Sequence, residues 1–414
     1  MKLRFAVPLL GIAVLVVSTA TACASSSSSS GSGNSSSTPF VVGAVLPISG
    51  AYSAVGVAEE PALKAIAAYY NKTGGVLGHK IELHIVNDGS SLQQAISATR
   101  SLASQYNMNL FIPDTISAQT LATLPLVPDA LSVSVCASND CGNPAKFPLA
   151  FDMNPPPDAL FQATARYIAD QGYKRVGMLA DDTTSGHSFD TVTTQYLQQL
   201  GVTVVAHEFA TPGTTDVSVQ LSKLKADGVN AVAAWVSGIG LDTATRSFQA
   251  IGWKVPLVLP NGFNYPQSVD TLVPSSVAPQ ITCVCDAVSV RSGSQVPAHI
   301  QTLLDIMKGY GPVTSLQLTA LTLDEVTIAK YGYEKAGTLD AKKAAAALEQ
   351  ISSDPSVVKS SAFFAYYGVN PGFTSSSHFP AVVPLLKSFF GTATVAKAVN
   401  GTYPGAVMAF QPAQ

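Results

Sequence analysis

The clearest binding chemistry in this sequence lies in residues 112–120, a stretch rich in hydroxyl side chains. An apolar run over residues 108–112 predicts a buried strand, and apolar residues at helical spacing predict a helix over residues 118–127. Such a junction exposes unpaired backbone N–H groups and the positive end of the helix dipole. Ser117, with Thr115 beside it, could therefore bind an anion such as a carboxylate. The alternative is that Ser117 only caps its helix.

Other reactive groups form no recognisable catalytic pattern. No Gly-x-Ser-x-Gly and no His-Glu-x-x-His occurs, and the 6 histidines are scattered. His187 lies beside Ser185, where a hydrogen bond to a ligand is one interpretation. Asp181 and Asp182 end a predicted strand, where α/β proteins bind ligands, although a solvated loop or a helix cap explains them equally well. We predict neither an enzyme nor a cofactor.

Composition limits the partners of the chain. Only 12% of the residues are charged and the net charge is −3, which argues against nucleic acid as a partner. Binding would then rest on hydroxyl and amide groups more than on ion pairs.

The N-terminus carries export signals. Lys2 and Arg4 precede an apolar run over residues 5–17, which predicts a signal peptide over residues 1–22. Small residues before Cys23 resemble a bacterial lipobox, so Cys23 is predicted to carry a lipid; the alternative is ordinary cleavage that leaves an odd thiol. Residues 23–38 would then be the lipidated cysteine and a disordered Ser/Gly tether. These features predict an extracytoplasmic protein anchored to the outer face of the cell membrane.

The remaining cysteines are Cys136, Cys141, Cys283 and Cys285. In an exported protein they are expected to form disulfides, and of three possible pairings we favour Cys136–Cys141 with Cys283–Cys285. A metal site would need histidine or carboxylate neighbours at ligand spacing, and none is present, so no metal is predicted.

Strands alternate with helices along the rest of the chain, which predicts parallel βαβ units. Three prolines at residues 155–157 interrupt the alternation, which then restarts. Further crossings are expected near residues 278–290 and near residues 362–373. The fold class is therefore α/β, with two Rossmann-like lobes joined by three hinge crossings. Lobe 1 is predicted to hold residues 39–155 and about 288–362, and lobe 2 residues 156–287 and about 363–414.

Two stretches resemble a known family. Residues 41–50 resemble the opening strand of the solute-binding proteins of branched-chain amino-acid-type ABC transporters, and residues 74–83 with Asn87-Asp88 resemble that family's turn and second strand. The resemblance implies a type I periplasmic-binding-protein fold with three hinge strands, one small-molecule ligand in the cleft and permease subunits as partners.

The resemblance also implies ligand-binding positions. Ser117 stands where the family holds the ligand's carboxylate and amine, and Cys136 and Ser138 stand at its backbone and hydroxyl positions beyond the fourth strand. An aromatic position falls on Val55, near Tyr52. Three further positions depart from the family's residue types: its tyrosine position falls on Ser185, another aromatic position falls on Ser237 near Trp235, and the acidic residue that pairs with a ligand ammonium falls on Asn261.

The loss of that acid bears on the ligand. A buried ammonium without a counter-charge costs several kcal/mol, enough to cancel micromolar affinity. Either Asp114, Asp181 or Asp182 supplies the charge, or the ligand lacks an ammonium. A carboxylate, amide, diol or aromatic acid then fits as well as leucine. The aromatic residues that could line an apolar or stacking pocket are Trp235, Tyr52, Phe263 and Tyr265, and the alternative for each is packing in a core or at a rim.

The sequence thus predicts a monomeric, lipid-anchored substrate-binding protein of an ABC importer that takes a small amino acid or a related polar or carboxylate solute. Two alternatives stay open. One is a pair of lobes that senses a ligand and signals to a membrane receptor, and the other is an exported hydrolase.

Overall fold

The computed structural model describes residues 38–260, 273–286, 298–351, 372–380, 390–394, 399–400 and 408–409. The predicted signal peptide, Cys23, the tether up to residue 37, Asn261, Phe263 and Tyr265 lie outside them. Within the described residues, no helix has the length and apolar character needed to cross a membrane.

Lobe 1 is built on a five-stranded parallel sheet in the order β2-β1-β3-β4-β5. Its strands are β1 (Phe40–Leu46), β2 (Ile81–Asn87), β3 (Leu110–Ile112), β4 (Leu131–Ser134) and β5 (Ala150–Asp152). β1 is buried along its whole length, because alternate residues face two different cores. The strand predicted from the apolar run over residues 108–112 is confirmed as β3, whereas β5 is a strand that the sequence did not predict.

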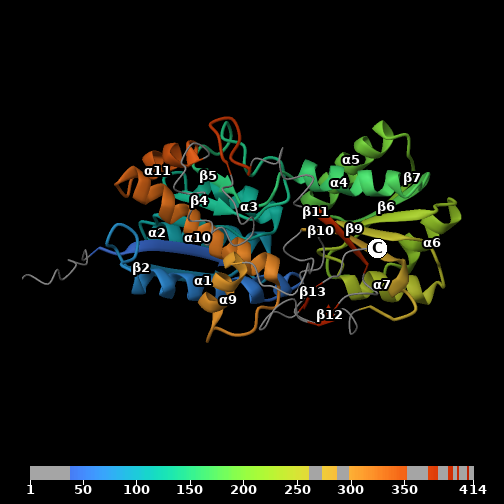
Figure 1. The fold of residues 1–414 in the computed structure, drawn as a ribbon, viewed down its shortest axis with the longest axis horizontal. Helices are drawn as coiled ribbons and strands as arrows, with labels where there is room; N and C mark the ends of the chain where they lie inside the picture. The colour runs from blue at the N-terminus through green and yellow to red at the C-terminus, as the bar shows by residue number, and fades with distance from the viewer. Residues whose placement is uncertain are drawn as a thin grey trace, which may run out of the picture. The chain divides into compact units, whose positions relative to one another are not determined.

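The helices of lobe 1 cover both faces of this sheet (Figure 1). One core joins the sheet to α1 (Ser53–Lys72), α9 (Ala298–Met307), α10 (Leu316–Ala336) and α11 (Ala341–Leu348). The other core joins the sheet to α2 (Leu92–Gln105). The short helix α3 (Ser117–Thr123) follows β3 and continues into the 3₁₀ helix η1 (Leu124–Leu126), which contains Pro125.

Lobe 2 is built on a six-stranded sheet in the order β11-β10-β9-β8-β6-β7. The parallel strands are β6 (Arg175–Asp181), β7 (Thr203–Ala210), β8 (Ala231–Trp235), β9 (Leu257–Pro260) and β10 (Ile281–Asp286). β11 (Phe390–Thr394) pairs antiparallel with β10. Short elements complete the described chain: η2 (Ala278–Gln280), β12 (Val399–Asn400) and β13 (Met408–Ala409).

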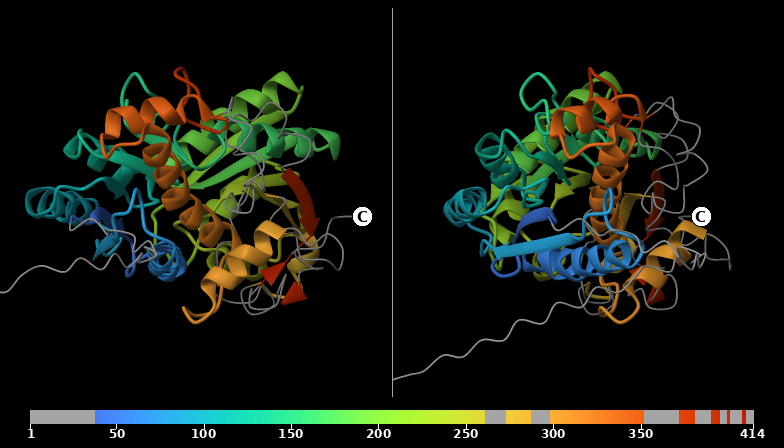
Figure 2. Two further views of the ribbon diagram at one scale, coloured as in Figure 1. Left: turned by 60° about the vertical axis from the view of Figure 1, so that its left-hand side comes forward. Right: turned by 90° about the vertical axis from the view of Figure 1, so that its left-hand side faces the viewer.

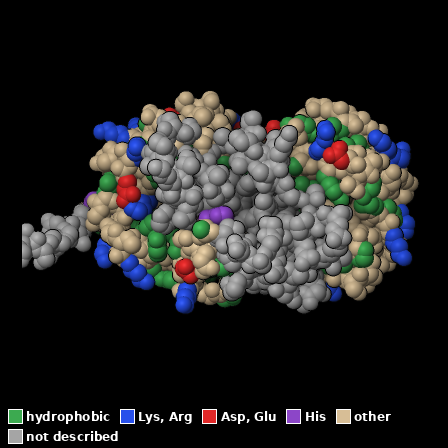
Figure 3. Space-filling model, in the orientation of Figure 1, with side chains coloured by type: hydrophobic (Ala, Val, Ile, Leu, Met, Phe, Trp, Pro, Cys, Tyr) green, Lys and Arg blue, Asp and Glu red, His purple; other side chains and the backbone are tan. Residues whose placement is uncertain are grey.

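Helices also sandwich the sheet of lobe 2 (Figures 1 and 2). On one face α4 (Pro157–Asp170) and α5 (Thr184–Gln199) share a core with β6 and β8. On the other face lie α6 (Ser218–Ala226) and α7 (Leu241–Ala250). On the face shown in Figure 3, charged side chains are few among the described residues, in keeping with a chain in which 12% of residues are charged.

The chain passes from lobe 1 to lobe 2 beside the prolines at residues 155–157. The chain leaves lobe 1 after β5 and enters lobe 2 at α4, so it crosses at residues 153–156. Asp152 anchors the start of this crossing, since its Oδ1 accepts hydrogen bonds from the Asn154 N–H (2.8 Å) and the Cys136 N–H (3.3 Å). The second crossing falls between β10 and α9.

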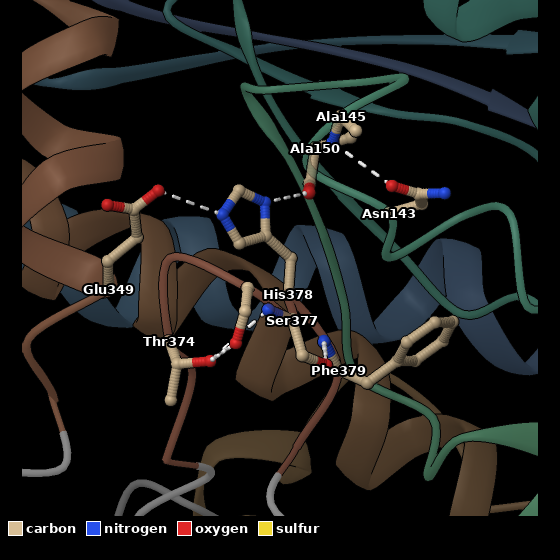
Figure 4. Close-up of polar contacts among 9 residues, drawn as sticks. Asn143, Ala145, Ala150, Glu349, Thr374, Ser377, His378 and Phe379 are labelled. Atoms are coloured by element: carbon tan, nitrogen blue, oxygen red, sulfur yellow. Dashed lines mark hydrogen bonds and ion pairs between the residues drawn. The ribbon is translucent and has the colours of Figure 1, made fainter.

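The third boundary differs from the prediction, because residues 372–380 pack on lobe 1. Phe373 lies in the lobe 1 core, edge-to-face with Phe151 at 5.1 Å. His378 is fully buried; its Nδ1 donates to the Ala150 carbonyl (2.8 Å) and its Nε2 lies 3.1 Å from Glu349 Oε1 (Figure 4). The assignment of residues from about 363 to lobe 2 is therefore wrong for this segment. The next described strand, β11, does belong to the lobe 2 sheet.

Candidate functional site

A cavity with an empty volume of about 860 Å³, part of it open to solvent, is lined by residues of both lobes. Most of its walls come from the carboxyl ends of parallel strands and the helices that follow them, where α/β folds bind ligands. The residues that line it are Tyr52, Val55, Thr115, Ile116, Ser117, Val135, Ala137, Asn154, Pro155, Pro157, Leu160, Phe161, Ser185, Trp235, Ser237, Gln317 and Leu318.

Ser117 joins two segments of the lobe 1 wall. Its Oγ accepts a hydrogen bond from the Ala137 N–H (3.1 Å), so it ties the start of α3 to the loop after β4. The predicted cap role is wrong: the cap position is Ile116, and no side chain caps the helix there. The side chain that bonds to the backbone just before the helix is Asp114, whose Oδ1 accepts a hydrogen bond from the Ile116 N–H at 2.8 Å.

The cavity carries no charged side chain among the described residues that line it. Several helices begin at its walls. Lining residues include Pro157 at the start of α4, Ser185 in the first turn of α5 and Gln317 in the first turn of α10. Each end contributes backbone N–H groups and a partial positive charge, which favour an acceptor or an anion.

An aromatic cluster forms part of the lobe 2 wall. Trp235 packs edge-to-face on Phe161, with ring centroids 5.7 Å apart, and stacks on Phe189 at 5.9 Å. The Trp235 Nε1 is buried and has no hydrogen-bond partner among the described residues. With Val55 and Leu160 also on the wall, the cavity offers apolar surface as well as hydroxyl groups.

Buried carboxyl groups lie directly behind the lobe 1 wall. The Thr115 hydroxyl donates to Glu59 Oε1, and Glu59 on α1 is 3% exposed. Burial raises the pKa of Glu59 to about 7. Burial and the neighbouring Asp88 carboxyl raise the pKa of Asp114 well above its usual range.

On the lobe 2 side, Asp181 supports the wall from behind. Its Oδ2 accepts from the Gly238 N–H (2.6 Å) and its Oδ1 accepts from the Thr183 hydroxyl (2.5 Å). Burial raises the pKa of Asp181 to about 6. Asp182 is exposed and pairs with His187 at 2.8 Å. Neither these residues nor Asp114 lines the cavity, so none of the carboxylates considered as a counter-charge faces it.

The two lobes touch at Tyr52 and Gly238. A Cβ placed on Gly238 would lie 2.4 Å from Tyr52 Oη and 3.0 Å from Pro212 Cβ, so only glycine permits this approach. Burial, and then the nearby Asp181 and Asp114 carboxyls, raise the pKa of Tyr52.

The cavity brings together seven of the residues singled out in the sequence: Tyr52, Val55, Thr115, Ser117, Ser185, Trp235 and Ser237. Cys136 and Ser138 are not among its lining residues. Sequence reasoning missed Asn154, Phe161 and Gln317. The prolines beside Asn154 marked a crossing, but the position of α10 against the site depends on packing between residues far apart in the sequence.

The predicted Cys136–Cys141 disulfide is confirmed, with an S–S distance of 1.98 Å. Asp152 lies near both sulfurs, but a disulfide leaves no thiolate to bind a metal ion. Cys283 is also disulfide-bonded. Because the side chain of Cys285 lies outside the described residues, the Cys283–Cys285 pairing stays a prediction.

Comparisons with known proteins agree with this architecture. The family model of the periplasmic binding proteins matches residues 39–370. The Leu/Ile/Val-binding protein homolog 1 of Brucella abortus (strain 2308) is 26% identical over 202 residues, which are 46% of this chain and 52% of that protein. The chain thus spans about half the length of the curated relatives it matches.

Solved structures share the fold at low sequence identity. A type 1 periplasmic binding protein from Bordetella pertussis Tohama I has a TM-score of 0.73 and 19% identity, covering 91% of this chain and all (100%) of that chain. A leucine binding protein from Thermotoga maritima has a TM-score of 0.64 and 20% identity, covering 75% and 87%. A Rhodopseudomonas palustris solute binding protein in complex with benzoate has a TM-score of 0.64 and 18% identity, covering 75% and 85%. With the family model matching residues 39–370, this chain belongs to the periplasmic binding protein family, and its two lobes share the fold of the type 1 member from Bordetella pertussis.

Proposed function

We propose that this chain is the lipid-anchored, extracytoplasmic substrate-binding protein of an ABC importer, and that it binds a small amino acid or a related polar or carboxylate solute in the cavity between its lobes. The observation that carries the proposal is the composition of the cavity: hydroxyl groups, helix N-termini and an aromatic wall, with no charged side chain among the described lining residues.

The absence of a lining carboxylate favours solutes without an ammonium group. A leucine ammonium buried here would have no opposite charge among the described residues of the wall, at a cost of several kcal/mol. A carboxylate, in contrast, would meet helix N-termini and the hydroxyls of Thr115 and Ser185. Two Rhodopseudomonas palustris relatives of the same fold were solved with benzoate and 4-hydroxybenzoate. We therefore place aromatic and apolar carboxylates ahead of leucine.

Binding without turnover accords with the site. None of the histidines in the described residues lines the cavity, so Ser117, Ser185 and Ser237 have no neighbouring base there that would activate a hydroxyl as a nucleophile. Closure of the two lobes would be favoured by a solute that contacts both walls at once, and the closed form would be the one presented to the permease.

A thermal-shift screen followed by calorimetric titration tests the proposal. The panel contains benzoate, 4-hydroxybenzoate, leucine and acetamide. We expect at least one carboxylate to raise the melting temperature by mass action, and benzoate to bind at least about tenfold more tightly than leucine. A panel in which no compound binds, or in which a bound compound is chemically converted, contradicts the proposal. Radiolabelled palmitate incorporated by the wild-type protein and lost in Cys23→Ala tests the lipid anchor separately.

A further inference from the structure

Thr115 lines the cavity, but its hydroxyl proton is used in a hydrogen bond within the protein. Its side chain lines the cavity, yet its Oγ1 donates to Glu59 Oε1 behind the wall. A threonine hydroxyl has one proton to donate. While that proton is directed at Glu59, Thr115 presents only lone pairs to the cavity, and these repel a carboxylate.

Glu59 sits in an acidic environment. Asp88 after β2, Asp114 after β3 and Glu325 on α10 all interact electrostatically within this group of carboxyls, and Asp152 and Asp324 face Glu325 in turn. Glu59 makes no ion pair with a described cation, and its Oε2 has no hydrogen-bond partner among the described residues. A buried carboxylate without a cation holds a proton more strongly than a solvated one, and burial accordingly raises the pKa of Glu59 to about 7.

We propose that Glu59 is a positioning residue that couples solute binding to protonation: as a neutral acid it donates to Thr115 and frees the Thr115 hydroxyl for an anionic solute, and as a carboxylate it captures that hydroxyl. The inference rests on the proposed function, because the solute carboxylate in the cavity is the acceptor.

The protons balance without any other reactant. When the solute binds to the ionised form, Glu59 takes one proton from solution and its O–H donates to Thr115 Oγ1. The Thr115 O–H rotates towards the solute carboxylate, and no covalent bond other than the new O–H on Glu59 changes. Solute affinity is therefore constant at pH values below the pKa of Glu59, and it falls as the pH rises through that pKa.

Calorimetric titration near pH 6 and pH 8 tests the inference, in two buffers with different ionisation enthalpies so that proton uptake can be counted. The probes are benzoate, 4-hydroxybenzoate and leucine. For the tightest of them, we expect the dissociation constant of the wild-type protein to be about tenfold larger near pH 8, with up to one proton taken up.

Glu59→Gln and Glu60→Gln form a matched pair of variants. Glu60 is the next residue on α1, but it is partly exposed and pairs with Lys64. Glu60→Gln should keep the tenfold pH dependence, and Glu59→Gln should reduce it to less than about twofold, since Gln does not titrate. Thr115→Val, which keeps the size of the side chain, should weaken binding near pH 6 and reduce the pH dependence below about threefold.

The outcomes are separable. If no probe binds at either pH, the proposed function fails and the inference fails with it. If a probe binds with the same affinity at both pH values, or if Glu59→Gln keeps the tenfold dependence, the inference alone is overturned. If Glu59→Gln keeps the dependence, another buried carboxyl near the cavity, such as Asp181 or Asp152, would be the source of the pH effect.

Discussion

The contact between Tyr52 and Gly238 gives a sharp test of lobe closure. Gly238→Ala adds a methyl group 2.4 Å from Tyr52 Oη and 3.0 Å from Pro212 Cβ, well inside van der Waals contact. The Gly238 loop has little freedom to retreat, because its N–H donates to Asp181 Oδ2 (2.6 Å) and its carbonyl accepts from the Gly213 N–H (2.7 Å). The Tyr52 side chain must therefore shift away from Gly238 and give up this contact between the lobes.

Overpacking of this kind costs about 1–3 kcal/mol, which corresponds to about fivefold to about a hundredfold weaker solute binding if the cost falls on the closed form. We expect calorimetric titration of Gly238→Ala with benzoate to show this loss. Urea unfolding of the ligand-free variant should stay close to wild type, since the clash lies between the lobes and not within either core.

A double-mutant cycle with Tyr52→Ala isolates the contact. In the Tyr52→Ala background, Gly238→Ala should cost much less, because the phenol is no longer there to clash. Wild-type affinity in Gly238→Ala would refute the reasoning. So would an equal loss in both backgrounds, because the effect would then not pass through Tyr52.

Three further predictions follow from the described contacts. Ser117→Ala should weaken solute binding by about 1–3 kcal/mol in a titration, because a buried solute acceptor would lose the Ser117 O–H as a donor, and unchanged affinity would remove Ser117 from the site. The pKa of Glu59 is raised from 4.5 to about 7, so the free energy of unfolding should fall by roughly 3 kcal/mol as pH rises from about 4.5 through about 7. Glu59→Gln should reduce the slope of unfolding free energy against pH in this range. An unchanged slope would contradict the assignment. Replacing Cys136 and Cys141 together by Ser should lower the free energy of unfolding by about 2 kcal/mol for so short a loop, and a urea midpoint equal to wild type would count against it.

The lobe architecture could be predicted because local patterns determine it. β1 is a continuous apolar run with both faces buried, and the prolines at residues 155–157 can continue neither a helix nor a central strand. β5 was missed because a strand of 3 residues next to prolines gives almost no periodic signal. The position of residues 372–380 could not be predicted either, since Phe373 and His378 are held by Phe151, Ala150 and Glu349, far away in the sequence.

The lining residues that could be predicted are those whose positions follow from the strand topology alone. Thr115 and Ser185 follow strands of parallel sheets, so the fold brings them to the cavity. The cap role of Ser117 was wrong because its Oγ accepts from the Ala137 N–H in the loop after β4, a contact that residue types alone do not settle. Glu59 gave no signal, since only the packing of α1 on the lobe 1 sheet places it against Thr115.

A crystal structure of the chain with benzoate, or with whichever panel carboxylate binds most tightly, tests the central claim most directly. We expect one solute in the cavity, with its carboxylate within hydrogen-bond distance of Thr115 and of a residue of lobe 2 such as Ser185 or Ser237. A solute bound outside the cavity, or held by one lobe only, would contradict the claim.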